Sequence, residues 1–219
     1  RKVAQNLGKK NPEKPEPART GNPETVTYPI AGDLTLKYAD AARDYSPYTI
    51  DPAVAKSLGL PAPIDPPRPP APWPGYATFW DPGRSIADLR RKHPAPFHPW
   101  LVWYDGLPFA KATDVFRWRQ LRLDPLLLGA AYADQAKLLP KGDEIPQARD
   151  IVTYMVVRFL ATGERWPGHR LRCRDVLAGD KRVIVGPFWD SGFEIAHCGE
   201  GYRSPGIGLA AANVPVQRR

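Results

Sequence analysis

Four side chains that could ligate a metal lie in the C-terminal quarter of the sequence. They are His169, Cys173, His197 and Cys198. Zinc sites usually contain a C-x2-C pair or ligands at similarly short, regular intervals. The intervals here differ from that pattern, and the adjacent His197 and Cys198 would point to opposite faces of a strand. The spacing therefore does not predict a metal site.

The sequence also shows no pattern for covalent catalysis or for phosphate binding. Cys198 could serve as a nucleophile beside a histidine, but no residue pattern marks a base, an orienting group or an oxyanion hole. The glycines fit neither GxGxxG nor GxxxxGKS/T, and they are Gly199, Gly201, Gly206 and Gly208. We therefore predict no catalytic residue, no cofactor and no metal. A small enzyme with an unrecognised site stays open as an alternative.

Arginines near aromatic residues form a second chemical pattern. Arg117 and Arg119 alternate with aromatic side chains, and Arg170 and Arg172 alternate along a segment that would share one face if extended. The formal net charge is +8, from 31 Lys and Arg against 23 Asp and Glu. Such patches suit rRNA, anionic lipid headgroups or an acidic protein face. The acids are spread along the chain, however, and no RNA-binding motif is present.

Proline determines how these residues can be positioned. The 219 residues contain 27 prolines, where ordinary usage would give about 11. Proline removes a backbone donor and fixes φ, which excludes a single helical bundle or a single large sheet. Residues 1–32 are expected to form an extended basic arm. Residues 61–74 hold eight prolines in 14 positions and predict a polyproline II strap.

Regular structure is expected only in short pieces. Two short helices are predicted at 51–59 and 85–93, the second capped by Ser85, with a short strand at 100–104. A helical unit at about 112–163 would contain helices over 113–121, 124–139 and 147–162, the last being central and ended by Gly163. A short β-hairpin is predicted at about 182–197.

These elements predict a fold that is mainly irregular with some α-helix and has long, extended proline-rich arms. The expected segments are the arm at 1–32, a proline- and aromatic-rich irregular segment with short helices at 33–111, the helical unit at 112–163, and a hairpin with a glycine-rich tail at 164–219.

Tryptophans in the irregular segment are candidates for binding a protein partner. Residues 73–118 contain 11 of the 23 aromatic residues. Tryptophan is a favoured interface anchor because it buries a large area with few rotatable bonds. We select Trp73, Trp80, Trp100 and Trp103 as anchors, together with Arg117, Arg119, Arg170 and Arg172 for charged contacts.

Cellular location is inferred from what the termini and cysteines suggest. The chain begins with Arg1, so a removed presequence of the mitochondrial type is expected. Two cysteines do not make a disulfide framework, and no segment has the ~20 apolar residues of a membrane span. We expect a peripheral protein of the mitochondrial inner membrane.

The sequence favours a non-catalytic accessory subunit of a large assembly, such as a respiratory-chain complex or ATP synthase. Its extended segments would strap neighbouring protein subunits together. The alternative is a mitochondrial ribosomal protein that contacts rRNA through its arginine clusters.

Overall fold

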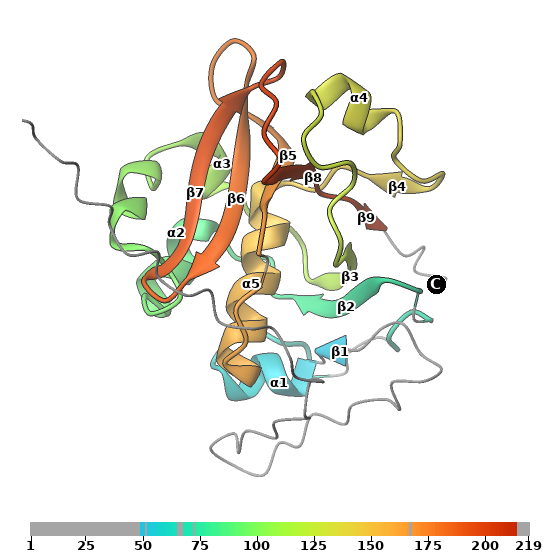
Figure 1. Ribbon diagram of the computed structural model, residues 1–219. Helices are drawn as coiled ribbons and strands as arrows, with labels where there is room; N and C mark the ends of the chain where they lie inside the picture. Colours follow the sequence, from blue (N-terminus) through green and yellow to red (C-terminus); the bar gives the residue numbers. More distant parts are fainter. Residues whose placement is uncertain (1–48, 51, 65–67, 72, 167, 214–219) are drawn as a thin grey trace, which may run out of the picture.

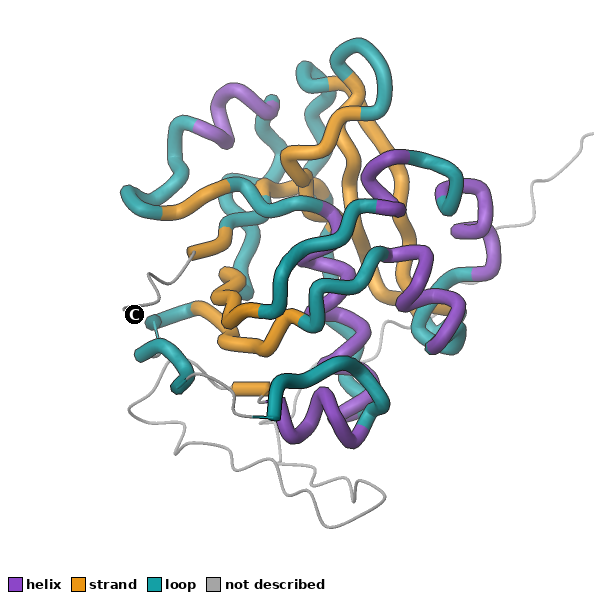
Figure 2. Tube along the Cα trace, turned by 180° about the vertical axis from the view of Figure 1, so that it is seen from behind, coloured by secondary structure: helices purple, strands orange, loops and turns teal. Residues whose placement is uncertain are grey.

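Two β-sheets form the body of the protein. The computed structural model describes residues 49–213 except 51, 65–67, 72 and 167. The expected arm at 1–32 therefore lies outside the described residues, as do residues 33–48 and 214–219. Strands and loops, rather than helices, make up most of the described chain (Figure 2).

The larger sheet has five strands in the order β1-β2-β3-β9-β4. β1 pairs with β2 in parallel, and the other pairs are antiparallel. The strands are β1 (Thr49–Ile50), β2 (Tyr76–Asp81), β3 (Arg117–Arg122), β4 (Asp143–Glu144) and β9 (Ala212–Asn213).

The smaller sheet has four strands in the order β7-β6-β5-β8, and β5 pairs with β8 in parallel. Its strands are β5 (Arg170–Val176), β6 (Lys181–Trp189), β7 (Gly192–Gly199) and β8 (Ile207–Leu209).

Helix α5 (Ala148–Thr162) runs between the two sheets and is the centre of the hydrophobic core (Figure 1). It packs against β2 of the larger sheet and against β5 and β6 of the smaller one. The other helices are short and lie at the periphery. They are α1 (Pro52–Ser57), α2 (Ile86–Lys92), the 3-10 helix η1 (Pro99–Tyr104), α3 (Pro108–Lys111) and α4 (Tyr132–Ala136).

Local capping signals set the ends of α5 and α2. At the start of α5, Asp150 accepts a hydrogen bond from the Gln147 N–H at 3.0 Å, which completes a capping box. Gly163 ends the helix with φ 74°, a left-handed conformation that favours glycine. In α2, the Ser85 hydroxyl accepts from the Asp88 N–H at 3.1 Å, as the sequence predicts.

The expected fold class, mainly irregular with a helical unit at about 112–163, is wrong because the protein is rich in β-structure. Of the three helices predicted in that unit, α5 is present, while Arg117–Arg122 forms strand β3. Directly opposite each other on neighbouring strands, Trp80 and Trp118 have their ring centroids 5.5 Å apart, which stabilises the antiparallel pair. The hairpin predicted at about 182–197 exists as β6 and β7, which pair with two further strands in the smaller sheet.

The segment predicted as a helix at 124–139 is mostly loop around the short α4. Leu126 exchanges backbone hydrogen bonds with Leu209 of β8, both at 2.9 Å. Two residues have positive φ, Leu127 at 41° and Gly129 at 78°, which interrupts any helix. Pairing with a strand distant in sequence thus overrides the local helical pattern.

The glycine-rich segment expected as a winding tail instead contributes one strand to each sheet. β8 joins the smaller sheet and β9 joins the larger one, and the residues between them are buried. This segment therefore connects the two sheets.

Gly208 should be sensitive to any side chain. A Cβ at Gly208 would lie 2.5 Å from the Pro125 Cβ, whereas one at Gly206 would meet nothing within 4 Å. We expect Gly208→Ala to lower the free energy of unfolding by about 1–3 kcal/mol, as overpacking does. Gly206→Ala should change it by less than about 0.5 kcal/mol. Urea unfolding followed by tryptophan fluorescence measures both, and equal effects would contradict the tight packing of β8 on this loop.

Candidate functional site

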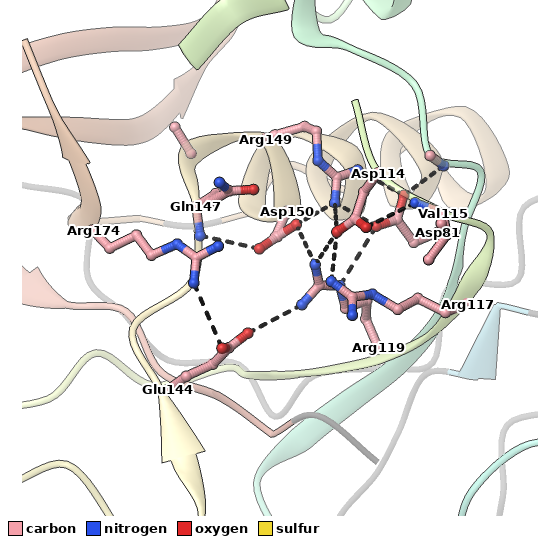
Figure 3. A network of polar contacts seen from close by, with 12 residues as sticks. Asp81, Asp114, Val115, Arg117, Arg119, Glu144, Gln147, Arg149, Asp150 and Arg174 are labelled. Atoms are coloured by element: carbon pink, nitrogen blue, oxygen red, sulfur yellow. Dashed lines mark hydrogen bonds and ion pairs between the residues drawn. The ribbon is translucent and has the colours of Figure 1, made fainter. Parts of the chain in front are cut away.

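A buried network of arginines and aspartates lies where β2, β3 and α5 meet (Figure 3). Asp81 ends β2, Asp114 precedes β3, Arg119 lies on β3, and Arg149 and Asp150 belong to the first turn of α5. The side chains of Asp81, Arg119, Arg149 and Asp150 are all less than 3% exposed. This is the largest cluster of ionisable groups in the described interior.

The two central arginines each bind several carboxylates. Arg149 donates two hydrogen bonds to Asp81, from Nη1 to Oδ1 at 2.9 Å and from Nη2 to Oδ2 at 2.7 Å. Arg119 Nη2 lies 3.0 Å from Asp150 Oδ1 and 2.8 Å from Asp114 Oδ2. Paired donors of this kind match the geometry of a carboxylate and make strong hydrogen bonds.

An outer ring completes the charge balance. Glu144 bridges Arg119 at 3.2 Å and Arg174 of β5 at 3.6 Å, and Arg117 binds Asp114 at 2.5 Å. The carboxylates are Asp81, Asp114, Glu144 and Asp150, and the guanidinium groups are Arg117, Arg119, Arg149 and Arg174. The formal charges of these groups sum to zero.

Three of the aspartates also resemble a cation site. Carboxylate oxygens of Asp81, Asp114 and Asp150 lie within 4.8 Å of one another, a donor set that Mg²⁺ or Ca²⁺ could use. The same oxygens accept hydrogen bonds from Arg119 and Arg149, however, so the positive charge is already supplied. The arrangement fits a structural ion-pair network better than a metal centre.

Burial and neighbouring charge act on this network in opposite directions. Burial raises the pKa of Asp150, although Arg119 and Arg149 oppose the rise. Burial acts in the same sense on Asp114, but the Val115 N–H and the surrounding arginines outweigh it and lower the pKa of Asp114. Burial disfavours the charge of Arg149, yet its hydrogen bonds and charge contacts with Asp81 raise its pKa overall. Contacts between the arginines and the aspartates therefore keep these groups charged inside the protein. Replacing one of them would leave an opposite charge buried with fewer partners.

Removing Arg149 should destabilise the fold strongly. Arg149→Met removes the bidentate partner of the buried Asp81, which then keeps Arg119 Nε at 3.5 Å and the Gly83 N–H at 2.8 Å, and breaking a buried ion pair typically costs about 3–5 kcal/mol. Arg91→Met is the control because Arg91 is 74% exposed in its pair with Asp88, and loss of such a pair costs less than about 1 kcal/mol. Urea unfolding measures both free energies, and a loss for Arg149→Met as small as that of the control would show that the network contributes little.

The histidines and cysteines considered for a metal are not brought together. Cys173 is buried, and burial raises its pKa well above the usual value. Cys198 is free and accepts a long hydrogen bond from Arg172 Nε at 3.5 Å. Among the described residues, the aspartate trio is the group whose ligand atoms converge closely enough for a metal.

The predicted arginine contacts divide into buried and surface positions. Arg172 is fully buried and binds the Gln135 side chain at 2.6 Å and the Ala130 carbonyl at 2.8 Å. Arg119 belongs to the network, so neither can reach a partner. Arg117 and Arg170 are partly exposed, and each forms an ion pair, with Asp114 and with Glu194 respectively.

The four predicted tryptophan anchors divide in the same way. Trp80 is 1% exposed and packs in the core against Trp118, so it cannot anchor a partner. Trp73 is 44% exposed, whereas Trp100 and Trp103 are 75% and 83% exposed. The last two lie together on η1.

Helix η1 forms where the sequence predicts a short strand. Pro99 occupies the first turn, and the His98 imidazole accepts a hydrogen bond from the Trp100 N–H at 3.4 Å. Residues three apart share a face in a 3-10 helix. Leu101 is buried and Tyr104 packs against Phe109, while Trp100 and Trp103 face outward. The helix is therefore anchored on one face and presents two indoles on another.

η1 and β7 enclose a groove of about 460 Å³, which we call the aromatic groove. In Figure 1 the green segment that leads into α3 lies beside β7. The start of the helix lies close to the β6–β7 turn. The backbone approaches so closely that a Cβ on Gly192 would lie only 2.4 Å from the His98 nitrogen. The groove is lined by His98, Trp100, Leu101, Trp103, Tyr104, Glu194, Ile195 and Ala196.

Comparison with protein-family models, curated proteins and solved structures finds no match to this chain. Within the described residues, no helix combines the length and the apolar character that crossing a membrane requires.

Proposed function

We propose that this protein is a non-catalytic subunit of a larger assembly and docks onto a protein partner through Trp100 and Trp103. One observation carries the proposal. The two indoles are 75% and 83% exposed on a helix whose other face is anchored in the core. Tryptophans are enriched among the residues that dominate binding energy. Val102 on the same helix is also 52% exposed, which extends the apolar surface.

The polar groups of the protein support a binding role over a catalytic one. The carboxylates of the ion-pair network bind the protein's own arginines. The network also lacks the solvent access that an active site needs, since its central members are almost fully buried. The aromatic groove, in contrast, is open and mainly apolar, and its size lies in the range of ligand and peptide sites.

The location of two arginines argues against the ribosomal alternative. Contact with rRNA would use Arg119 and Arg172 among others, and both are less than 2% exposed and bound to protein groups. A mitochondrial respiratory-chain complex or ATP synthase, at the inner membrane, stays a prediction from the sequence. Strapping by residues 1–32 also stays a prediction, because that arm lies outside the described residues.

Removing both exposed indoles should release the protein from its assembly. We expect Trp100→Ala with Trp103→Ala to weaken binding at least about 100-fold, since each interface anchor is typically worth 2 kcal/mol or more. The measurement is co-migration of the tagged protein on native gels and density gradients, with mass spectrometry of the fractions.

Trp73→Ala is the matched control, because Trp73 is an exposed tryptophan that packs on Tyr76, outside the aromatic groove. It should leave co-migration intact, and thermal unfolding should show that all variants are folded. Unchanged co-migration of the double variant would contradict the proposal. Co-sedimentation with rRNA would favour the ribosomal alternative.

A further inference from the structure

The outer edge of β7 forms one wall of the aromatic groove. β7 is the last strand of the smaller sheet, paired with β6 on its inner side. Among the described residues, the outer side makes backbone pairing only at a single parallel bridge between Phe97 and Phe193. The pairing stops there because the chain turns into η1.

The backbone of β7 beyond this bridge faces the groove. The Phe193 N–H donates to the Pro96 carbonyl at 2.9 Å, and the Phe193 carbonyl accepts from the His98 N–H at 3.1 Å. Both groups of Phe193 thus point away from β6. Backbone direction alternates along an antiparallel strand, so Ile195 and His197 also direct their N–H and C=O groups outward. These groups form a template for one more strand.

The sequence of β7 itself lacks the features that usually protect an edge strand against pairing. Natural proteins place lysine, proline or bulges on exposed edges, or keep those edges very short. β7 is eight residues long and its sequence, GFEIAHCG, contains neither lysine nor proline. Its bulge falls on the β6 side, where two residues oppose Glu194. The edge strands β1, β4 and β8 have only two or three residues each.

The shape of the groove favours a single extended chain over a second copy of this protein. η1 stands along the same edge and closes the groove on its far side. A second copy that paired through its own β7 would have to place the rest of its sheet where η1 stands. A lone peptide strand has no such obstacle.

The charge of the groove favours a cationic side chain on a bound peptide strand. Glu194 is the only acidic residue in the lining, and no lysine or arginine lines the groove in the described part of the chain. Its ion pair with Arg170 is 3.3 Å long and both side chains are at least 35% exposed, so the carboxylate can turn toward another cation. The faces of Trp100 and Trp103 also attract cations.

We infer that the aromatic groove takes an extended segment of the partner protein, which adds to β7 as a strand and places a lysine or arginine side chain against the two tryptophans and Glu194. This inference rests on the proposed function and names the partner's binding mode. Backbone hydrogen bonds from Ile195 and His197 would give affinity, and the cationic side chain would give specificity.

The test is an NMR titration of the full chain with the peptide acetyl-Thr-Val-Lys-Val-Thr-amide. Shifts should concentrate on the indole N–H groups of Trp100 and Trp103 and on the amides of Ile195 and His197. Replacing the peptide lysine with glutamate, or N-methylating the backbone that faces β7, should each weaken binding at least about tenfold, as loss of a charge contact or of a strand ladder implies. Glu194→Gln should reduce the preference for lysine over glutamate.

Several outcomes would overturn the inference. They are the absence of any shift at these four residues, equal binding of the lysine and glutamate peptides, or no effect of N-methylation. A concentration-dependent dimer that dissociates in Trp103→Ala would show instead that a second copy occupies the groove. If the tryptophan variants lose the assembly but N-methylation has no effect, the proposed function stands and strand addition fails.

Discussion

The buried pair of Arg149 and Asp81 constrains how the central helix can lie against the larger sheet. Neither charge has access to water, so each requires charged partners inside the protein, and breaking a buried pair of this kind costs several kcal/mol. The pair fixes the first turn of α5 to the end of β2, and Arg119 adds β3 to the same cluster. Through Glu144 the network extends to Arg174 of the smaller sheet. Charge balance therefore sets the placement of the central helix against the larger sheet, while the pair with Arg174 is a partly exposed contact to the smaller sheet.

The C-terminal segment closes the same framework from the opposite end of the sequence. β8 and β9 pair with strands that precede them by tens of residues, and the alanines between them are buried in the core. Arg172 reinforces this closure because it binds the loop around α4 and the Tyr202 carbonyl together. Neither sheet is complete until this last segment is in place, which makes the fold depend on contacts between distant parts of the chain.

Local signals in the sequence predicted the elements that local physics determines. Ser85 as an N-cap, Gly163 as a helix end and the β6–β7 hairpin follow from side chains near their own backbone. β3 was not predicted, because its arginines suggest a surface that faces solvent or nucleic acid. Their partners are aspartates of β2 and α5, which lie far away in the sequence. The loop at 124–131 was missed for a similar reason, since its backbone bonds are made with β8. No pattern along the chain reveals such pairings.

The aromatic groove exists because residues 99–104 form a helix where the sequence predicts a strand. A strand at 100–104 would have extended the pairing of residues 96–98 along β7 and covered its edge. Proline at 99 lacks the N–H that a strand needs, and His98 caps a helix there instead. The resulting turn removes the backbone from β7 while leaving two tryptophans beside it. The sequence predicts Trp100 and Trp103 as anchor candidates but does not separate them from the buried Trp80, because only the helical spacing of three places both on the outer face. The exposed indoles and the unpaired strand edge are thus two results of the same change in backbone direction.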